Sequence, residues 1–414
     1  MAKPPRYKPR LIVFDVEGVL IPRNRFFFLM GKTLGFAQLI RVFFYGLLYE
    51  TGLIPLKLAM KHLFRGARGI TIETLMQIAS KVPIVPGARG VFDQLKAQGY
   101  KTALITSGLP TLVAKLVAEK LGADYAFGFE AEINGNKFTG EIWGDVIEQN
   151  GKLAVLQRII KDEQLEFSDC AVVADDRNNA SIFLRDMLKI AYNPDFVLRI
   201  KADKVVTGNI SKILSAINGE PKRRGKPSWN DVFRELIHAS GIFIPVIASV
   251  VGVPLVAVSI ILVIGLYATS EYLRTEGKKM PLINFITRKA ASQNELYQIV
   301  LAPVYFAIGI LVTLVIFPAP ASSAAIAIFA FGDSTASIFG RYLAKTPLPF
   351  NNDKSLEGSI AGFFFALLAG SFFVSPLVAL VGAAIAMFIE YLPLPINDNL
   401  LIPLITGLAL TFLG

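Results

Sequence analysis

The chain has 414 residues, of which 53% are hydrophobic and only 18% are charged, and its formal net charge at neutral pH is +10. This composition is too apolar for an ordinary soluble protein. The apolar residues are concentrated in residues 233–414, mostly in stretches near the ~20 residues that a membrane-spanning helix needs. The sequence therefore predicts a soluble domain over residues 1–217, a basic linker over 218–229 and a membrane domain over 230–414.

Basic residues cluster in residues 1–10, 219–229 and 274–290. The last two clusters flank apolar stretches, which is the positive-inside distribution of membrane proteins. Attraction to anionic membrane lipids explains them more simply than binding to nucleic acid, which we do not expect. Because residues 1–10 lead into a predicted strand without the pattern of a secretory signal, we expect a multi-pass protein of the cell membrane whose N-terminal domain is cytoplasmic.

The only cysteine, Cys170, lies in the apolar run CAVVA. A lone cysteine cannot form an intramolecular disulfide, and in an apolar strand it usually acts as a small buried hydrophobe. We therefore predict that Cys170 is buried.

The soluble part alternates strand and helix patterns. Apolar runs predict strands at residues 11–14, 101–106, 170–174, 189–192 and 204–206, with helical segments between them. This alternation predicts an α/β fold with a doubly wound parallel sheet. Ligands of such sheets bind beyond the carboxyl ends of the strands. At those ends lie Asp15, Glu17, Ser107, Gly108, Asp175 and Asp176.

Four short motifs follow one another in this part: DVEG at 15–18, TSG at 106–108, GK at 151–152 and ADDRNN at 174–179. In this order they resemble the haloacid dehalogenase superfamily, and within it the phosphoserine-phosphatase-like branch, over residues 8–217. The resemblance implies a Mg²⁺-dependent phosphatase that acts on a phosphomonoester. It also implies a helical cap, which we place at residues 24–85.

The resemblance assigns a role to each motif. Asp15 would be the nucleophile that forms an aspartyl-phosphate, and Glu17 would be the general acid. Ser107 and Lys152 would hold the phosphoryl oxygens. Asp15, Asp175 and a backbone carbonyl near Glu17 would bind Mg²⁺.

Three positions depart from the family pattern. Glu17 is one methylene longer than the usual Asp, and Asn179 stands where a second acidic residue is common. Both leave open a catalytically inactive regulatory domain. Asn24 stands where the serine-phosphate enzymes place a carboxylate that meets the substrate amine, so an amino-acid substrate is not expected.

Residues 25–64 of the predicted cap are more apolar than a solvent-facing lid requires. Seven of its residues recur at helical spacing and form one apolar face. This face either packs on the core of the domain or rests on the bilayer surface, where basic residues of the cap would help to admit a lipid phosphate. The apolar residues are Phe36, Leu39, Ile40, Phe43, Phe44, Leu47 and Leu48, and the basic ones are Arg25, Lys32, Arg41 and Lys57.

The membrane part predicts an all-α domain of about seven spanning helices. We place them at residues 232–251, 253–272, 297–317, 319–339, 360–375, 376–391 and 400–413. With a cytoplasmic start, the second and fourth spans return to the cytoplasm, so residues 274–294 and 340–359 are expected on that side.

Polar residues at the end of the fourth span suggest a binding site. Asp333, Ser337 and Arg341 recur at four-residue spacing and share one face of the helix. Three residues that suit phosphate, Lys345, Lys354 and Ser355, come next along the chain.

Other spans add further polar groups. Glu357, Glu390 and Asp398 offer the oxygen ligands that Mg²⁺ prefers. Arg234 and His238 share a face at the start of the first span. Membrane anchoring explains the basic residues, but it does not explain carboxylates near hydrocarbon, which are costly there.

Four segments carry a second resemblance: RELIHASG at 234–241, FGDSTASIFGR at 331–341, KSLEGS at 354–359 and IEYLPLPINDNLLIP at 389–403. They resemble the CTP-dependent polyprenol kinase family, which includes dolichol kinase, phytol kinase and CTP-dependent diacylglycerol kinase. The resemblance implies CTP as phosphoryl donor and a lipid alcohol, isoprenoid or related, as acceptor. One departure is Glu235, where a second basic residue is expected.

We assign roles to these residues accordingly. Asp333 and Glu357 are expected to be catalytic, and Asp333, Glu390 and Asp398 to bind the metal ion. The nucleotide is expected to meet Ser337, Arg341, Lys345, Lys354, Ser355, Arg234 and His238.

The sequence therefore favours a bifunctional membrane enzyme, a CTP-dependent lipid kinase fused to a phosphatase. Three alternatives stay open. The first is a lipid kinase with an inactive sensor or docking domain. The second is a CTP-dependent cytidylyltransferase, although no PGHGG-like segment is present. The third is a transporter with a regulatory domain, although no inverted repeat is evident.

Overall fold

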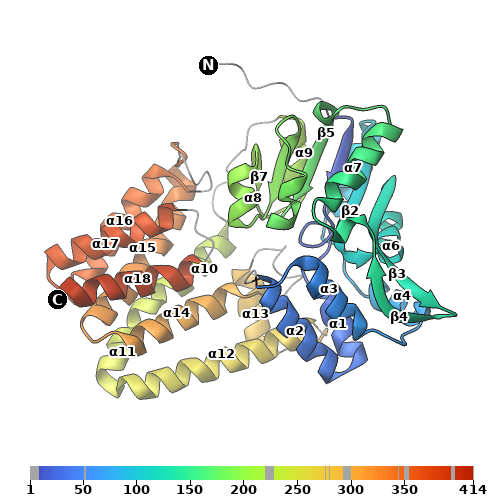
Figure 1. Ribbon diagram of the computed structural model, residues 1–414. Coiled ribbons are helices and arrows are strands. Elements are labelled where there is room, and N and C mark those ends of the chain that lie inside the picture. Colours follow the sequence, from blue (N-terminus) through green and yellow to red (C-terminus); the bar gives the residue numbers. More distant parts are fainter. Residues whose placement is uncertain are drawn as a thin grey trace. The chain divides into compact units, whose positions relative to one another are not determined.

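The computed structural model describes residues 9–50, 53–219, 228–275, 277–278, 280–291, 300–343, 345–348, 354–392 and 397–413. The chain divides into two compact units, residues 1–222 and 223–414. The N-terminal unit contains strands and helices, whereas the described part of the C-terminal unit is helical (Figure 1).

A seven-stranded sheet forms the centre of the N-terminal unit. Every neighbouring pair of strands is parallel except the pair β3–β4. Strands β1 and β5 are completely buried and wholly apolar, as is usual for parallel strands covered on both faces. The strand order is β4 (Lys137–Trp143), β3 (Tyr125–Asn134), β2 (Lys101–Pro110), β1 (Leu11–Phe14), β5 (Cys170–Ala174), β6 (Leu188–Tyr192) and β7 (Lys204–Val206).

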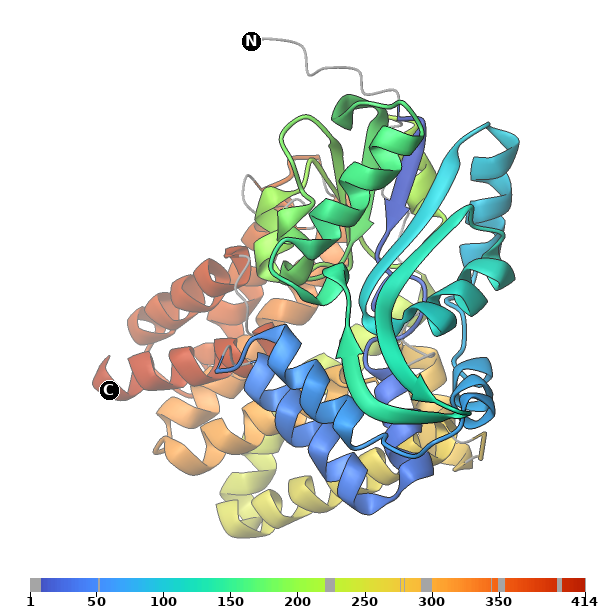
Figure 2. The same cartoon turned by 45° about the vertical axis from the view of Figure 1, so that its right-hand side comes forward.

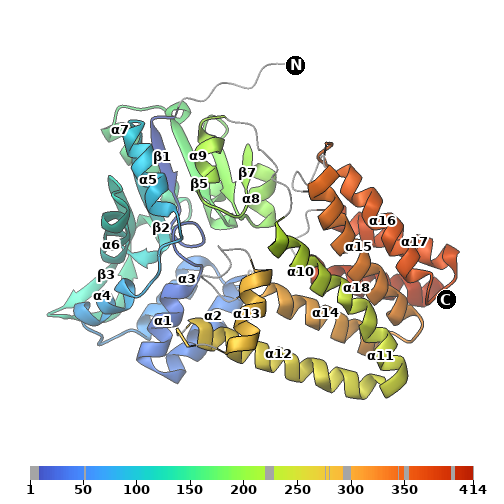
Figure 3. The same ribbon diagram turned by 180° about the vertical axis from the view of Figure 1, so that it is seen from behind.

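Helices cover both faces of this sheet. Helices α5 (Ala88–Ala97), α6 (Thr111–Leu121) and α9 (Lys212–Ile217) lie on one face, and α7 (Gly151–Asp162) lies on the other (Figures 1 and 3). The short helix α8 (Phe196–Lys201) packs beside β6. The predicted doubly wound parallel sheet is thus confirmed, and its central strands β1, β2 and β5 place their carboxyl ends side by side.

The hairpin of β3 and β4 was not among the predicted strands. Its tight turn contains Gly135 at a φ of 62°, a left-handed conformation that glycine adopts without strain. Figure 2 shows the hairpin extending from the sheet to the cap, where β4 packs beside helix α3. The Asn-Gly-Asn sequence at the turn was a usable hairpin signal.

Four helices form the cap: α1 (Arg25–Leu34), α2 (Phe36–Glu50), α3 (Leu56–Arg65) and α4 (Ile72–Ser80). Their buried residues join the core of the sheet. Phe64 packs edge-to-face against Phe27 and, at 4.8 Å between ring centroids, against Phe129 of β3. These aromatic contacts hold the cap over the end of the sheet.

The apolar face of α2 is only partly used in this packing. Ile40 and Phe44 are 51% and 55% exposed, so they do not belong to the core. Leu48 is half-buried. The other members of the predicted face, the side chains of residues 36, 39, 43 and 47, lie outside the described residues.

Cys170 is fully buried in β5, as predicted. Burial, together with the nearby charge of Asp169, raises the pKa of its thiol to about 12. The thiol therefore stays protonated at neutral pH and packs as a small apolar group.

The C-terminal unit is built from helices α10 to α18. The segment 229–251, α12 and α15 are each long and apolar enough to cross a membrane, whereas α14, α16, α17 and α18 have 15 or 16 residues. A helix of that length rises only about 24 Å, less than the hydrocarbon thickness of ~30 Å. The helices are α10 (Trp229–Ala239), α11 (Phe243–Val251), α12 (Val253–Thr275), α13 (Pro281–Ala290), α14 (Ala302–Ile316), α15 (Ala321–Leu343), α16 (Leu356–Gly370), α17 (Pro376–Tyr391) and α18 (Asp398–Leu413).

These helices bear out an all-helical unit but do not confirm seven spans. Every predicted span overlaps a helix, but the first is made of α10 and α11 joined by a short 3-10 turn. Among the described residues, three segments reach spanning length. Helix α16 begins at Leu356, four residues before the predicted span, because the Ser355 side chain caps it by accepting the Gly358 amide.

Small residues bring α15 and α16 into close contact. A Cβ atom on Gly358 would lie 2.6 Å from the Ala336 carbonyl oxygen, and one on Gly362 would lie 2.7 Å from the Ala336 Cβ. Only glycine allows this approach, as in many packed membrane helices. The contact places the start of α16 beside the polar end of α15.

Candidate active sites

The first candidate site lies at the carboxyl ends of three strands of the N-terminal unit. Asp15 follows β1, Ser107 lies near the end of β2, and Asp175 follows β5. These three residues, like Lys152 on α7, are all at least 94% buried. The sheet thus brings together the four residues that the motifs predicted, although more than 150 residues separate the first from the last.

A hydrogen-bonded network surrounds Asp15. Lys152 Nζ lies 3.0 Å from Asp15 Oδ1 and donates to Asn179 Oδ1 at 2.7 Å. Asn179 Nδ2 donates in turn to Asp15 Oδ2 at 2.5 Å and to Asp176 Oδ1 at 3.0 Å. The Val16 amide donates to Asp15 Oδ1. Both oxygens of the predicted nucleophile are therefore fixed in orientation.

Three carboxylates converge beside this network. Ligand oxygens of Asp15, Asp175 and Asp176 all lie within 4.8 Å of one another. Burial raises the pKa of Asp175 to about 8 despite the attraction of the Arg23 guanidinium, which pairs with it. Burial and the charge of Asp15 also raise the pKa of Asp176. With its carboxyl groups buried close together, the cluster favours a proton or another cation among them.

Glu17 lies at the same end of the sheet. Its Oε1 is buried and has no hydrogen-bond partner among the described residues. Burial and the charge of Asp15 raise the pKa of Glu17 to about 8, so this carboxyl is protonated at neutral pH. A protonated carboxyl is the form that a general acid requires.

Two glycines make room for these carboxylates. A Cβ atom on Gly108 would lie 1.4 Å from Glu17 Oε2, and one on Gly18 would lie 1.8 Å from Asp175 Oδ2. Gly18 also has a φ of 78°. The glycines of the DVEG and TSG motifs therefore leave the space in which the acidic side chains sit.

Ser107 and the cap complete this site. Ser107 Oγ donates to the Val146 carbonyl at 2.7 Å, which fixes the hydroxyl near the base of the site. Tyr49 of the cap helix α2 hydrogen-bonds to Asn178, and its backbone carbonyl accepts from Arg177 at 2.8 Å. The cap is thus attached to the loop that carries the acidic motif.

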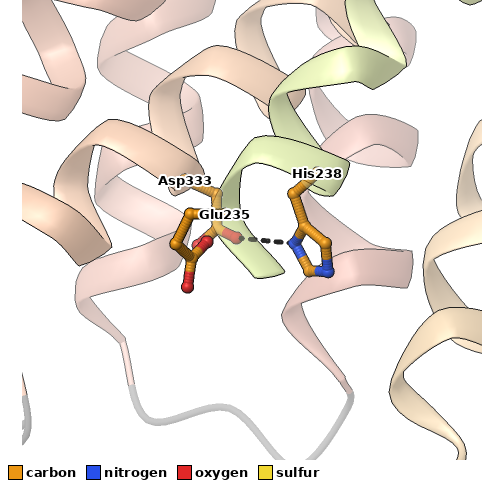
Figure 4. A group of neighbouring side chains, drawn as sticks. All are labelled: Glu235, His238 and Asp333. Carbon is orange, nitrogen blue, oxygen red and sulfur yellow. Dashed lines mark ion pairs between the residues drawn. The ribbon is translucent and has the colours of Figure 1, made fainter. Parts of the chain in front are cut away.

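The second candidate site lies in the C-terminal unit, at the meeting of α10 and α15. Ligand atoms of Glu235, His238 and Asp333 lie within 4.8 Å of one another, and Figure 4 shows the three side chains pointing into one space. His238 Nδ1 is 3.8 Å from Asp333 Oδ2 and has no hydrogen-bond partner among the described residues. Glu235 is buried and accepts two hydrogen bonds from Arg234.

Lys354 connects this group to a third helix. Its Nζ lies 3.7 Å from Asp333 Oδ1 and 2.5 Å from Oε1 of Glu390, at the end of α17. Glu390 is 1% exposed, and its Oε2 has no hydrogen-bond partner in the described part of the chain. Asp398, at the start of α18, is close enough to attract the Lys354 ammonium electrostatically.

The other predicted residues of this unit have different surroundings. Arg341 forms an ion pair with Asp231 of α10 at 2.5 Å. Glu357 accepts from the Thr346 amide, and the Ser355 hydroxyl caps α16. Ser337 is half-buried one turn beyond Asp333, and Lys345 is exposed.

Several residues of these sites were not predicted as site residues. Asp176 belongs to the acidic cluster, and Arg23 pairs with Asp175. Asn179, which was noted only as the replacement of an acidic residue, hydrogen-bonds to Asp15. Glu235, identified only as a departure, is a member of the second group. The sequence could have predicted Asp176 as a ligand, because it is adjacent to Asp175. It could not have predicted the contacts of Asn179, because their partners lie far away in the chain.

Comparison with known proteins bears on the N-terminal unit. Residues 12–178 match the family of haloacid dehalogenase-like hydrolases. The chain is 32% identical over 206 residues to the phosphoserine phosphatase of Archaeoglobus fulgidus, covering 49% of this chain and 57% of that protein. It is 33% identical over 136 residues to that of Methanocaldococcus jannaschii, covering 33% of this chain and 64% of that protein. The chain thus spans less than two thirds of each of these relatives.

Solved structures include similar chains. A substrate-bound phosphoserine phosphatase complex aligns with 52% of this chain and 99% of its own, at 24% identity and a TM-score of 0.46.

Residues 12–178 of the N-terminal unit are therefore similar to haloacid dehalogenase-like hydrolases, and the unit has the α/β sheet predicted from its motifs. More particularly, this domain is similar to the phosphoserine phosphatases. The family match ends at residue 178, so the resemblance of the C-terminal unit to polyprenol kinases stays a prediction.

We predict that Asn179→Ala destabilises the N-terminal unit, because it removes one buried hydrogen bond from Lys152 and one from Asp15. The expected loss of stability is about 1–3 kcal/mol. Amide hydrogen exchange in β1 and β5 of the full-length protein measures it. Asn134→Ala, which removes an exposed side chain from β3, is the control and should leave the exchange unchanged. Unchanged exchange in Asn179→Ala would show that the network contributes nothing to the fold.

Proposed function

We propose that the chain is a bifunctional membrane enzyme, in which the N-terminal unit hydrolyses a phosphomonoester and the C-terminal unit transfers a phosphoryl group from CTP to a lipid alcohol. The observation that supports the first activity is the buried network of Asp15, Lys152 and Asn179 beside Asp175 and Asp176. The observation that supports the second is the meeting of His238, Asp333, Lys354 and Glu390.

The N-terminal site suits Mg²⁺. Its donor set is three carboxylates within 4.8 Å of one another, and Mg²⁺ prefers oxygen ligands. Asp15, Asp175 and Asp176 would hold the ion, which neutralises charge between a carboxylate nucleophile and an anionic phosphate when bound. Burial disfavours the charged form of Asp175 and Asp176, and a bound cation would offset that penalty.

The residues of the chain divide the hydrolysis between them. Asp15 attacks phosphorus, and the substrate oxygen leaves with a proton from Glu17. Lys152 and the Ser107 hydroxyl hold the phosphoryl oxygens as charge moves onto them. Glu17 then takes a proton from the water that opens the aspartyl-phosphate, which returns both carboxyl groups to their starting states.

The position of Asn179 bears on the alternative of an inactive domain. An aspartate here would add a fourth carboxylate to a site whose nearby cations are Lys152 and Arg23. The neutral amide instead donates to Asp15 and accepts from Lys152, so it supports the nucleophile. This contact favours an active phosphatase. Because Asn24 is exposed and carries no charge, the proposed substrate is a phosphomonoester other than an amino-acid phosphate.

The C-terminal site suits phosphoryl transfer because such transfer depends mainly on positioning and charge neutralisation. Asp333 and Glu235 would hold Mg²⁺ together with phosphate oxygens of the nucleotide. Lys354, which already lies between two carboxylates, would meet the transferred group. Glu235, Asp333 and Glu390 are buried in an apolar unit, where a carboxylate is costly. Binding a metal ion would offset that cost.

We predict that Asp15→Asn reduces phosphatase activity to background and leaves CTP-dependent lipid kinase activity within about threefold. The two sites belong to separate compact units, and distant changes are usually independent. Phosphate release and labelled lipid phosphate, measured on the same preparation, check both halves of this expectation. Parallel loss of the two activities would show that they share one site.

We predict that Gly108→Ala lowers phosphatase turnover by about 10²-fold, because the new methyl group displaces Glu17, and general acids typically contribute 10²–10⁴-fold. The loss should be large with an alkyl phosphate and small with p-nitrophenyl phosphate, whose leaving group needs no proton.

Gly90→Ala is the matched control for this variant. A Cβ atom there meets nothing within 4 Å, so activity should be unchanged. Equal losses on both substrates in Gly108→Ala would assign the effect to general damage rather than to the acid.

We predict that Asp333→Asn and Lys354→Ala each lower lipid kinase turnover by about 10²–10³ while the protein still inserts in the membrane, because each removes a preorganised charge. Lys278→Ala removes an exposed basic residue of the same unit and should have little effect, since one surface lysine contributes only ~1 kcal/mol of attraction to a membrane. Normal turnover in both site variants would sink the nucleotide site and most of the case for a kinase.

A further inference from the structure

An apolar groove lies between α11, α12 and α14 of the C-terminal unit. Its volume is about 450 Å³, within the range of ~300–1,000 Å³ that is typical of ligand pockets. Its walls include Ile247, Leu255, Ala307 and Ile310. The only polar side chain in the lining, Ser259, uses its hydroxyl to bond the Leu255 carbonyl of its own helix. Such walls suit hydrocarbon and offer nothing to a polar molecule.

One end of this groove adjoins the second candidate site. Phe306, which lines the groove, stacks on the His238 ring at 4.5 Å between centroids and an interplanar angle of 20°. A Cβ atom on Gly241 would lie 3.0 Å from Phe306, so glycine leaves the room for this ring. A single phenyl group therefore separates the groove from His238 and, 3.8 Å further on, Asp333.

We propose that this groove holds the hydrocarbon chain of the lipid alcohol, with its hydroxyl beside His238. The inference rests on the proposed kinase function and names the place where its acceptor binds. His238 Nδ1 is buried without a hydrogen-bond partner in the described residues. The ring packs on Phe306, which lines the groove, and its Nδ1 faces Asp333 (Figure 4). An amphiphile with an apolar chain and a terminal hydroxyl matches both environments. His238 acts as a positioning residue that orients the hydroxyl.

The charges at this end of the groove distinguish an alcohol from a bilayer phospholipid. Three buried carboxylates, Glu235, Asp333 and Glu390, outnumber the two neighbouring cations, Arg234 and Lys354. Without a bound Mg²⁺, an anionic phospholipid headgroup would be repelled here, whereas a neutral hydroxyl would not. Ordinary acyl chains of the membrane are therefore the alternative that an experiment must exclude.

Photolabelling of the full-length protein in detergent tests the proposal without CTP. The probe is a long-chain isoprenoid alcohol with a diazirine on its chain. We expect labelled peptides within residues 243–263 and 302–310. Ala307→Trp, which fills the groove, should reduce labelling at least about tenfold, a loss of 1.4 kcal/mol in binding. Val315→Trp is the matched control on the same helix, where the side chain is 58% exposed, and should leave labelling intact.

The hydroxyl end has its own test. The unlabelled alcohol should compete with the probe at least about tenfold better than the hydrocarbon that lacks the hydroxyl. His238→Phe keeps an aromatic ring against Phe306 but loses the nitrogens, so it should abolish this preference. Equal competition in the unchanged protein would mean that the groove holds any chain, and labels confined to other helices would overturn the site.

The labelling experiment and the kinase assay can fail independently of each other. Groove labelling without CTP-dependent product would support the binding site and reject the kinase. CTP-dependent product with labels elsewhere would support the kinase and reject the groove.

Discussion

Both candidate sites depend on one electrostatic constraint: each buries more carboxyl groups than it has neighbouring basic side chains. Removing a carboxylate from water costs several kcal/mol unless a cation and hydrogen bonds offset the lost hydration. In the N-terminal unit Lys152 meets Asp15, and in the C-terminal unit Lys354 meets Asp333 and Glu390. In each case the carboxylates outnumber the cations, so each site is suited to take up further positive charge. That is the electrostatic state in which a divalent cation and a phosphate can bind together.

Glycine and alanine make these charged sites geometrically possible. Gly18 and Gly108 leave the space occupied by the carboxylates of Asp175 and Glu17. In the C-terminal unit Gly358 and Gly362 bring α16 against α15, and this contact brings Lys354 to Asp333. The role of the glycines is therefore different from that of the charged residues. The charged residues carry the chemistry, whereas the glycines set the distances at which it is performed.

The two proposed activities place opposite demands on water. The phosphatase needs a water molecule to open the aspartyl-phosphate, and a carboxyl group, Glu17, that exchanges protons with it. A kinase must keep water from its donor, and the apolar groove lined by Phe306, which packs on His238, would serve that need. Separate sites meet both demands. Because hydrolysis of the kinase product would cancel the transfer, the two activities fit distinct substrates or sequential steps.

The sequence by itself determined much of the N-terminal site. Parallel strands end at one edge of a sheet, so the motifs at the carboxyl ends of β1, β2 and β5 had to converge, and Asp15, Ser107 and Asp175 do so. Hydropathy likewise located the apolar helices of the C-terminal unit, because a helix in an apolar environment satisfies its backbone internally and needs only apolar side chains.

Only the tertiary structure decided which side chains meet across helices. That Glu235 joins Asp333, that Lys354 reaches Glu390 and that His238 stacks on Phe306 depends on the distance and rotation of packed helices. Those quantities come from contacts between segments distant in the chain, such as the glycine contacts of α15 and α16. The same holds for Asn179, whose value to Asp15 lies in a hydrogen bond across 164 residues of sequence. The local sequence predicts which face of a helix or strand a side chain occupies. The fold alone decides which residue lies opposite that face.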